Sequence, residues 1–411
     1  MTVTQTAPER LESVAAAQSR LLDIVRSLDA EDVALERAAG RVLAAPVVAR
    51  WDLPGFDNSA MDGYAVRASE VAGAVADAPV RLPVRGEVAA GRRAGALAAG
   101  TAMRIFTGAA LPAGADAVVR QEDTRRDGDD VLIEVAVAPG TAVRRRGEDI
   151  TTGTVVLQPG GRVSPADIAV AAAAGSGALR VGRRPRVAVV AAGDELRPAG
   201  SDLDGAQVAD SNSPMIAAAV REAGGEPVLL GIASDDPAVL RQTLRTAMES
   251  SDLIVSSAGV SVGDHDHVRE VLADLGEIGV WRVAMRPGKP LLIGRAGAVP
   301  FIGLPGNPVS SSVTFELFAR PAILRLQGAA DVTRRRVRVR LGEDIAKPAG
   351  LETYARARLV ESGADLPVAL SSGGQGSHMI SALVAADVLL VLPAETASMP
   401  RGAVVEAIPL R

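Results

Sequence analysis

"DLIVSSAGVSVGDHDHVREVLADL" (252–275) is the stretch that decides the fold. An apolar run is followed by small and polar residues and then by apolar residues at helical spacing, the pattern of strand, loop and helix. Similar segments precede it in "RVAVVAAG" (186–193), "SPMIAAAVREAGG" (213–225), "EPVLLGIASDD" (226–236) and "PAVLRQTLRTAMES" (237–250). This alternation predicts a mostly parallel sheet with βαβ crossovers over residues 183–330. Such sheets bind ligands beyond the carboxyl ends of their strands.

The segments on either side of this domain differ from it in pattern. Residues 9–49 carry apolar residues at helical spacing, and we expect them to be helical. "VSPADIAVAAAAG" (163–175) predicts another helix, with Ser164 as its N-cap and Gly175 at its end. Short strand-like pieces between Gly and Pro turns, typical of small β domains, make up the rest. We therefore expect four parts: a discontinuous helical domain of residues 1–50 plus 151–182, a β insert domain of 51–150, an α/β domain of 183–330 and a C-terminal β domain of 331–411.

Composition limits the classes of function. The 411 residues carry a formal net charge of −5, which gives no globally basic surface for nucleic acid. There is no cysteine, which excludes disulfides and thiolate metal sites. No apolar run approaches the roughly 18–20 residues of a membrane-spanning helix, and the N-terminus lacks the features of a signal peptide. We expect a cytoplasmic protein that binds neither membrane nor nucleic acid.

Acidic residues follow three of the predicted strands. Glu195 follows the first, Asp235 the second and Asp266 the third. Carboxylates gathered at one sheet edge are costly unless a cation or ligand pairs with them, and their oxygens suit Mg²⁺. Each residue could instead cap the helix that follows it. His265 and His267 leave a zinc site open as an alternative, although no third ligand is evident nearby.

Two loops offer small residues and backbone amides to a ligand. Ser257 and Gly259 belong to the loop after the third strand, and Asn307 lies in "GLPGNPVSSS" (303–312) ahead of a helix. Amides at the start of a helix suit an oxyanion. Ordinary capped turns are the alternative, and neither a Walker A nor a G-x-G-x-x-G pattern accompanies these loops.

"MRPGKP" (285–290) supplies the opposite charge. Arg286 and Lys289 flank a Pro-Gly turn, and Lys289 is one of two lysines among 44 basic residues. Lysine is a compact point charge, whereas arginine is a planar fork. We interpret the retained lysine as a requirement for a point charge beside a small anion; chance placement of one of two lysines is the alternative.

Eight motifs, in order along the chain, resemble those of the MoeA family of molybdopterin molybdenumtransferases, which is similar to the E domain of gephyrin. They are "PGFDNSAMDGYAVR", "TGAALPAGADAVV", "RRRGEDI", "GDEL", "SAGVSVGD", "RPGKP", "GLPGNPVS" and "GQGSH". The resemblance covers nearly the whole chain. It implies an α/β multidomain fold: a central MogA-like α/β domain with a mostly parallel sheet, a discontinuous helical segment, a β insert domain and a C-terminal β-barrel-like domain. It also implies a homodimer whose site lies between the α/β domain of one subunit and parts of the other.

The same resemblance implies a reaction and its partners. Molybdenum from molybdate is inserted into adenylylated molybdopterin, AMP is released, and Mg²⁺ is required. Transient contacts with the molybdopterin adenylyltransferase and with molybdoenzyme acceptors are expected. A non-catalytic pterin-binding scaffold of the same fold is one alternative, and a metal-dependent phosphohydrolase that uses His265 and His267 is another.

Site residues follow from the resemblance and from the loops described above. Catalytic positions match Asp62, Thr107, Asp149, Glu195, Asp235 and Asp266, of which the last three are expected to hold Mg²⁺. We expect molybdate or the pterin to be bound by Arg282, Arg286, Lys289, Arg356 and Ser377, together with the loop residues Ser257, Gly259 and Asn307. The chain departs from the family pattern in two places. Arg282 and Arg286 stand where many members carry lysine, and Ala258, His265 and His267 stand where Gly, Ala and Tyr are usual.

Overall fold

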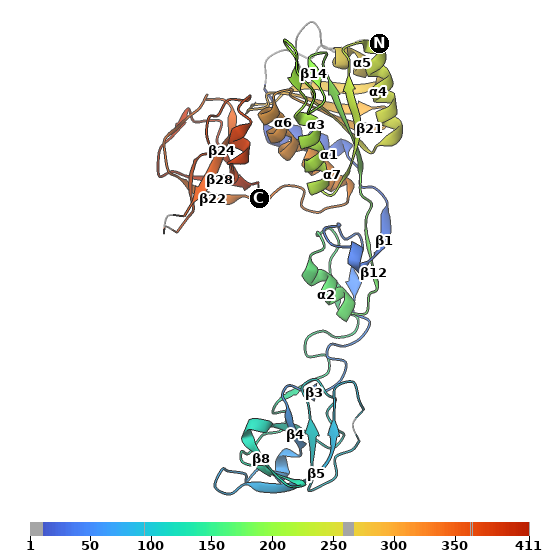
Figure 1. The fold of residues 1–411 in the computed structure, drawn as a ribbon, viewed down its shortest axis with the longest axis vertical. Coiled ribbons are helices and arrows are strands. Elements are labelled where there is room, and N and C mark those ends of the chain that lie inside the picture. The colour runs from blue at the N-terminus through green and yellow to red at the C-terminus, as the bar shows by residue number, and fades with distance from the viewer. Residues whose placement is uncertain (1–10, 94, 258–266, 362, 364, 411) are drawn as a thin grey trace.

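The structure is a computed structural model that describes residues 11–410 except 94, 258–266, 362 and 364. The molecule is elongated, with the β insert domain at one end and the α/β domain at the other (Figure 1). Between them lies a part that contains β1 (Ala30–Ala34), α2 (Pro165–Ala173) and β12 (Ala178–Gly182), which we call the discontinuous unit (Figure 1). The C-terminal domain packs beside the α/β domain (Figure 1). This arrangement separates candidate site residues that lie in different parts of one chain.

The α/β domain is built on a six-stranded sheet in the order β16-β13-β17-β21-β20-β18. Its strands are β13 (Arg186–Ala192), β16 (Glu226–Ala233), β17 (Leu253–Ser257), β18 (Gly276–Arg282), β20 (Pro290–Ala296) and β21 (Val299–Leu304). The first three pairings are parallel, and the last two are antiparallel. The predicted mostly parallel sheet is therefore confirmed.

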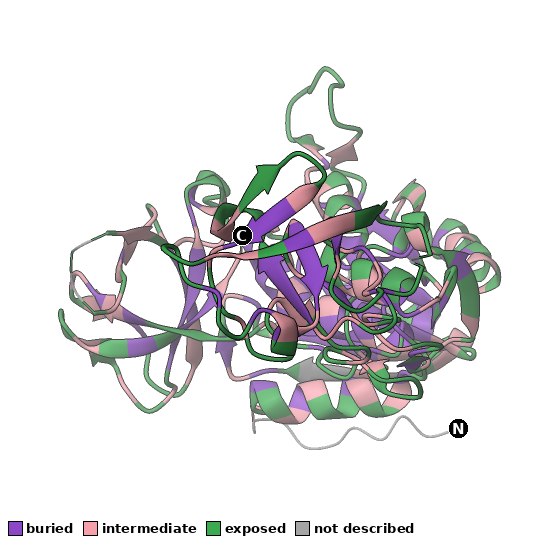
Figure 2. Cartoon of the chain, turned by 90° about the horizontal axis from the view of Figure 1, so that it is seen from below, coloured by how far each residue is buried: buried purple, intermediate pink, exposed green. Residues whose placement is uncertain are grey.

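Helices cover both faces of this sheet. They are α1 (Val14–Ile24), α3 (Asn212–Glu222), α4 (Pro237–Ser250), α5 (His267–Leu275), α6 (Pro308–Thr314) and α7 (Arg320–Leu326). One core joins residues of α1, α3, α6 and α7 to one face, and a second core joins α4 and α5 to the other. Figure 2 shows that buried residues concentrate in the strands. Because the sheet is covered on both sides, its inner strands β13, β17 and β21 are buried at nearly every position rather than at alternating ones.

The expected helix over residues 9–49 is wrong beyond residue 24. After α1 the chain forms β1 (Ala30–Ala34), a short 3-10 turn and β2 (Val47–Val48). β1 pairs with β12 (Ala178–Gly182), and β2 pairs with β11 (Val155–Leu157). These partners lie more than a hundred residues away, so local periodicity does not reveal them.

The predicted helix near residue 164 is confirmed as α2 (Pro165–Ala173). The Ser164 hydroxyl accepts a hydrogen bond from the Asp167 amide at 3.2 Å, and the Asp167 carboxylate accepts one from the Ser164 amide at 2.7 Å. This reciprocal pair satisfies two amides that the first turn leaves free. Gly175 follows with a φ of +95°, the left-handed conformation that suits glycine after a helix.

The insert and the C-terminal domain are both built on strands. The insert sheet contains β4 (Gly63–Val66), β5 (Val80–Val88), β6 (Ala102–Ile105), β7 (Ala117–Arg120), β8 (Thr124–Asp127) and β9 (Asp130–Ile133). The C-terminal domain contains β22 (Val337–Leu341), β24 (Glu352–Val360), β25 (Val368–Ser371), β26 (Val388–Leu392) and β28 (Val404–Pro409). The pairings β24–β25, β25–β22, β22–β28, β28–β26 and β26–β24 close these strands into a barrel. The predicted fold class is confirmed.

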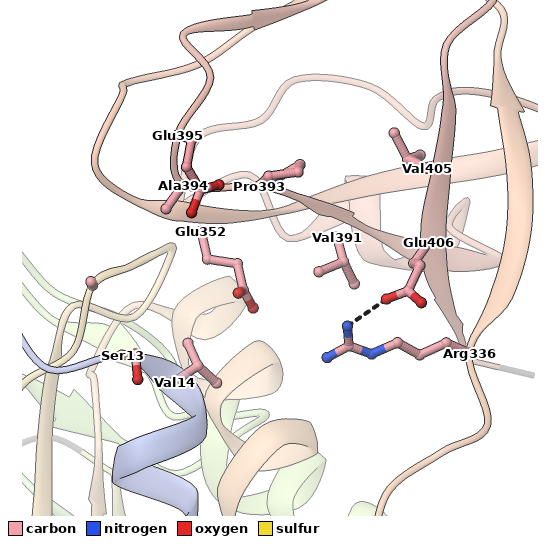
Figure 3. A pocket seen from close by; sticks show the side chains of 11 residues that line it. Ser13, Val14, Arg336, Glu352, Val391, Pro393, Ala394, Glu395, Val405 and Glu406 are labelled. Atoms are coloured by element: carbon pink, nitrogen blue, oxygen red, sulfur yellow. Dashed lines mark hydrogen bonds and ion pairs between the residues drawn. The ribbon is translucent and has the colours of Figure 1, made fainter.

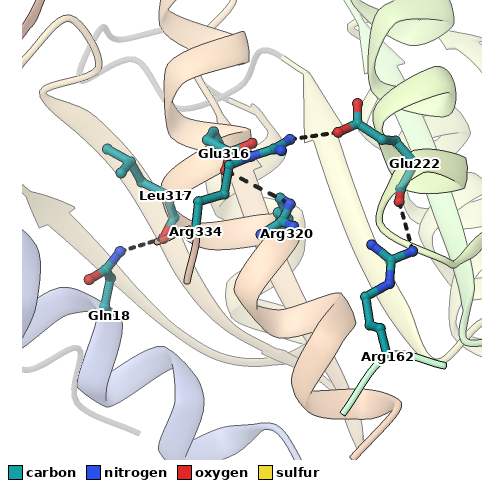
Figure 4. A network of polar contacts seen from close by, with 7 residues as sticks. All are labelled: Gln18, Arg162, Glu222, Glu316, Leu317, Arg320 and Arg334. Carbon is teal, nitrogen blue, oxygen red and sulfur yellow. Dashed lines mark hydrogen bonds and ion pairs between the residues drawn. The ribbon is translucent and has the colours of Figure 1, made fainter. Parts of the chain in front are cut away.

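An ionic cluster joins three parts of the chain (Figure 4). Arg334, in the segment that leads to the C-terminal domain, donates hydrogen bonds to Glu316 at 2.8 Å and to Glu222 at 2.6 Å. Arg320 lies 3.8 Å from Glu316, and Arg162 of the discontinuous unit donates to the Glu222 carbonyl at 3.3 Å. Burial raises the pKa of Glu316. The cluster ties the discontinuous unit and the C-terminal segment to the helices of the α/β domain.

Candidate active site

One edge of the central sheet gathers six of the predicted site residues. Parallel strands β16, β13, β17 and β21 end there. Antiparallel β20 begins there and β18 ends there, because Leu292 pairs with Gly303 and Arg282 with Pro290. Taken across the sheet, the residues at this edge are Asp235, Glu195, Ser257, Asn307, Lys289 and Arg282.

Among the predicted site residues, charge is ordered along this edge. The carboxylates follow the two outer strands on one side, and the cations flank the two outer strands on the other. Neighbouring strands lie about 4.8 Å apart, so the three steps from β13 to β20 span roughly 14 Å. The edge can therefore accept an elongated ligand that has a metal-binding end and a separate anionic group.

The acidic side contains Glu195 and Asp235, both exposed. The Asp194 amide donates to Asp235 Oδ2 at 3.3 Å, and the Asp235 amide donates to Asp194 Oδ1 at 3.2 Å, so the two strand ends are linked. The Glu195 carboxylate folds back over Gly193, where an added Cβ would lie 2.4 Å from Glu195 Oε2. Gly193, with a φ of +142°, thus gives Glu195 the space it occupies.

The middle of the edge contains polar residues that the sequence analysis did not select. Asn212, the first residue of α3, donates from Nδ2 to Ser257 Oγ at 2.7 Å and to the Gly306 carbonyl at 2.7 Å. Asp210 Oδ1 accepts from the Asn212 and Ser213 amides at 3.1 and 3.0 Å. The sequence feature that could have identified these residues is the string "DSNSP" (210–214), in which an aspartate precedes the helix by two residues.

The basic side contains Arg282, Arg286 and Lys289, all exposed. The Val283 amide donates to the Lys289 carbonyl at 2.9 Å, which closes the turn between β18 and β20. Gly288 has a φ of +104°, and a Cβ there would lie 2.4 Å from Thr314 Cγ2, so the turn requires glycine. The turn therefore holds Lys289 at the sheet edge.

The C-terminal domain reaches the same region. The Val309 amide in α6 donates to the Ser377 carbonyl at 3.3 Å. Arg356 of β24 is 0% exposed and donates from Nη2 to the carbonyls of Gly374 and Gly376 at 2.7 and 3.1 Å. Burial lowers the pKa of Arg356. Its guanidinium thus holds the loop that carries Ser377, and direct contact with a ligand stays a prediction.

Asp62 and Thr107 form a pair on the β insert domain. The Thr107 amide and hydroxyl donate to Asp62 Oδ1 at 2.7 and 2.8 Å. The hydrogen bond from the Thr107 amide has the largest effect in lowering the pKa of Asp62, and the hydrogen bond from the Thr107 hydroxyl lowers it further. Asp149 lies near the neck of the insert, where its amide donates to the Leu53 carbonyl at 3.0 Å. The insert domain, which carries the pair, lies at the opposite end of the molecule from the α/β domain (Figure 1).

Two of the three "RRRGED" arginines, Arg145 and Arg146, pair with acids although their side chains stay exposed. Arg146 donates to Asp52 at 2.5 Å, and Arg145 donates to Asp57 at 2.7 Å. The Thr152 amide and hydroxyl also donate to Asp52, at 2.7 and 2.8 Å. These contacts hold together the two chain segments that connect the insert to the rest of the molecule.

A cavity of about 430 Å³ lies elsewhere, between the start of α1 and the C-terminal barrel (Figure 3). Its walls include Ser13, Arg336, Glu352 and Glu406, and Arg336 donates to Glu406 at 2.7 Å. None of the predicted site residues lines it. The open sheet edge, rather than this cavity, holds the predicted chemistry.

Three predicted residues, Gly259, His265 and Asp266, lie outside the described residues. Among the residues that the structure does describe, no three metal-ligating side chains come together. The exposed carboxylates of Glu195 and Asp235 are nevertheless the hard oxygen ligands that Mg²⁺ accepts.

In the same described part of the chain, no helix is both long and apolar enough to cross a membrane.

Known proteins share this organisation over the length of the chain. Family profiles match residues 12–175 (MoeA N-terminal region, domains I and II), 188–325 (probable molybdopterin binding domain) and 338–410 (MoeA C-terminal region, domain IV). The chain is 39% identical to molybdopterin molybdenumtransferase 2 of Mycobacterium tuberculosis, over 95% of this chain and 98% of that one. It is 42% identical to the molybdopterin molybdenumtransferase of a Nostoc species, over 79% and 76% of the two chains. A molybdopterin biosynthesis MoeA protein of Pyrococcus horikoshii superposes with a TM-score of 0.84 at 30% identity, over 97% of this chain and 100% of that one.

Proposed function

The chain belongs to the MoeA family and is a transferase of molybdenum cofactor biosynthesis, and from this premise we propose how it acts on its substrates. It takes molybdate and adenylylated molybdopterin, inserts molybdenum into the dithiolene and releases AMP. The observation that carries the proposal is the order of charge among the predicted site residues along the sheet edge, with carboxylates after β13 and β16 and cations beside β18 and β20. An adenylylated pterin and an oxyanion need this separation of a cation-binding end from an anion-binding end.

The acidic side suits the phosphate-to-AMP link. Glu195 and Asp235, with Asp266, would hold Mg²⁺, which when bound supplies positive charge beside the phosphate oxygens. Asp194 keeps the two strand ends together through its exchange of hydrogen bonds with Asp235. The carboxylates thereby orient the phosphate end of the substrate toward the strand ends.

The basic side suits molybdate. Arg282 and Lys289 flank β18 and β20 at the end of the edge remote from the carboxylates, Arg286 lies in the turn between them, and the three cations attract the dianion. Arg356 contributes by holding the 373–377 loop, whose Ser377 contacts the start of α6. Ser257 and Asn307 lie between the two sides, where the pterin would span them.

A second copy of the chain supplies Asp62 and Thr107. Both belong to the β insert domain, which lies far from the sheet edge of its own chain (Figure 1). A twofold dimer can bring the insert of one subunit to the edge of the other, so that each site is shared. Homodimer formation is thus a requirement of the proposed chemistry.

Subunit complementation tests the shared site. Chains with Asp62→Asn and chains with Asp235→Asn are co-expressed, and each is inactive alone. Random pairing makes about half of the dimers mixed, and each mixed dimer has one intact site of two, so about a quarter of wild-type activity returns. Asp62→Asn paired with Thr107→Ala is the control, because both changes lie on the insert and no intact site forms. Absence of recovery in the first pair would show that each site uses a single chain.

AMP release tests the reaction itself. The wild-type dimer is supplied with adenylylated molybdopterin and Mg²⁺, with and without molybdate. We expect AMP to be released only when molybdate is present. Tight binding of the pterin without AMP release would contradict the proposal and indicate a scaffold, whereas AMP release that ignores molybdate would indicate a hydrolase.

A further inference from the structure

Asn212 bridges two segments in the middle of the candidate site, the carboxyl end of β17 and the loop after β21. Its side chain is 7% exposed, and Nδ2 donates to Ser257 Oγ and to the Gly306 carbonyl, each at 2.7 Å. Ser257 ends β17, and Gly306 follows β21, so one carboxamide connects the ends of two neighbouring strands. We propose that Asn212 is a positioning residue, which sets the separation between the carboxyl end of β17 at Ser257 and the loop after β21 at Gly306 for substrate binding.

The chemistry of the two acceptors explains why the residue is asparagine. A carbonyl oxygen only accepts hydrogen bonds, so the group that faces Gly306 must be a donor. Aspartate has the same shape but no donor when ionised, and alanine reaches neither segment. Glutamine is one methylene longer and does not fit a site in which both bonds are already short.

The backbone around Asn212 holds this side chain in place. Asp210 Oδ1 accepts hydrogen bonds from the amides of Asn212 and Ser213, which anchors the start of α3. Ile216, one turn later, is fully buried in the core beneath the sheet. The carboxamide therefore projects from a rigid element, which is what a residue that aligns two segments requires.

The role rests on the proposed function, because the two segments are those expected to span the pterin. Without the bridge, Ser257 and Gly306 lose their shared hydrogen-bond donor at the start of α3. A displacement of about 1 Å in a site of this kind costs on the order of a hundredfold in rate. Binding of the pterin substrate should suffer most, since it contacts both segments, whereas molybdate binding beside Lys289 should change little.

Gln327 provides a matched control. It is a carboxamide that is 2% exposed, and its Nε2 donates two hydrogen bonds of 2.9 Å, to the carbonyls of Ala223 and Ile323. Ala223 lies at the carboxyl end of α3, so Gln327 contacts the same helix as Asn212 but at the end away from the two segments. Replacing either carboxamide by alanine removes the same number of buried hydrogen bonds.

Steady-state kinetics of the two variants test the proposal in the full-length dimer. We expect Asn212→Ala to lower kcat/KM for adenylylated molybdopterin about tenfold to hundredfold, chiefly through KM, and to leave KM for molybdate within about twofold. Gln327→Ala should leave both values within about twofold. Equal losses in the two variants, or an unchanged kcat/KM in Asn212→Ala, would overturn the proposal.

Hydrogen–deuterium exchange gives a readout that does not depend on turnover. Amides in 303–310 should exchange faster in Asn212→Ala than in wild type and should be unaffected in Gln327→Ala. Asn212→Asp keeps the volume of the side chain and replaces the alanine variant if that variant does not fold. We expect the same faster exchange in Asn212→Asp. Normal exchange together with normal kinetics would refute the role of the Asn212 Nδ2 donor. Wild-type protein without any AMP release would count against the proposed function alone, because the exchange comparison would still decide the role of Asn212.

Discussion

Replacing Arg356 by methionine should separate the stability of the C-terminal barrel from the activity of the site. The guanidinium is 0% exposed, it makes no ion pair in the described part of the chain, and its Nε and Nη1 atoms have no hydrogen-bond partner there. Its two hydrogen bonds hold the carbonyls of Gly374 and Gly376. The residue thus buries a charge whose only described contacts are to one loop.

Two opposing terms decide the effect on stability. Hydrogen bonds from a charged donor contribute about 1.5–3 kcal/mol each, so losing both costs about 3–6 kcal/mol. Removing a buried charge that has no ionic partner stabilises the folded state by several kcal/mol, because the cost of desolvating that charge no longer applies. Methionine fills much of the vacated volume with a flexible apolar chain. We expect the free energy of unfolding of the barrel to change by less than about 2 kcal/mol.

Activity should fall steeply although the fold survives. The loop that carries Ser377 loses both anchors, and a shift of about 1 Å costs on the order of a hundredfold in kcat/KM. Scanning calorimetry measures the barrel transition, and molybdate-dependent AMP release measures turnover. Arg358→Met is the control, since Arg358 lies on the same strand but is exposed. Destabilisation beyond about 4 kcal/mol would show that the relieved charge burial does not offset the lost hydrogen bonds. An unchanged kcat/KM would show that the loop that carries Ser377 does not need Arg356 for activity.

Three further predictions concern other parts of the molecule. Lys289→Arg should keep the fold but lose molybdate-dependent turnover, because a planar fork replaces a point charge; unchanged turnover at limiting molybdate would contradict it. Gly63→Ala should destabilise the insert by about 1–3 kcal/mol or more, since the new Cβ would lie 1.9 Å from the Val119 carbonyl oxygen, and an unaltered thermal transition would speak against this. Hydrogen bonds from the Thr152 amide and then its hydroxyl lower the pKa of Asp52 from 3.8 to about 2, so this contact stabilises the neck above pH 3.8 and is lost as pH falls through about 2; in acid unfolding, the advantage of wild type over Asp52→Asn should be constant above pH 3.8 and should disappear as pH falls toward about 2.

Part of the site follows from local pattern. The acids Glu195 and Asp235 come directly after continuous apolar strands, and parallel strands end at one edge, so their meeting was predictable. The reciprocal bonds between Asp194 and Asp235 confirm that these two strand ends lie together. Asn212 was not predictable in its role, because the acceptors Ser257 and Gly306 lie 45 and 94 residues away in sequence.

The sequence by itself determined the α/β domain, the capped helix at Ser164 and the strand-rich nature of the two flanking domains, because periodicity, capping and turn residues act within a few positions of the chain. Only the tertiary structure decided which strands pair. It replaced the expected helix after residue 24 with strands that pair across the discontinuous unit. It also turned β20 antiparallel, which brings the Lys289 turn to the same edge as the carboxylates. Backbone hydrogen bonds between distant strands leave no local signature, so the separation of acid from base along the sheet depends on strand order and not on composition.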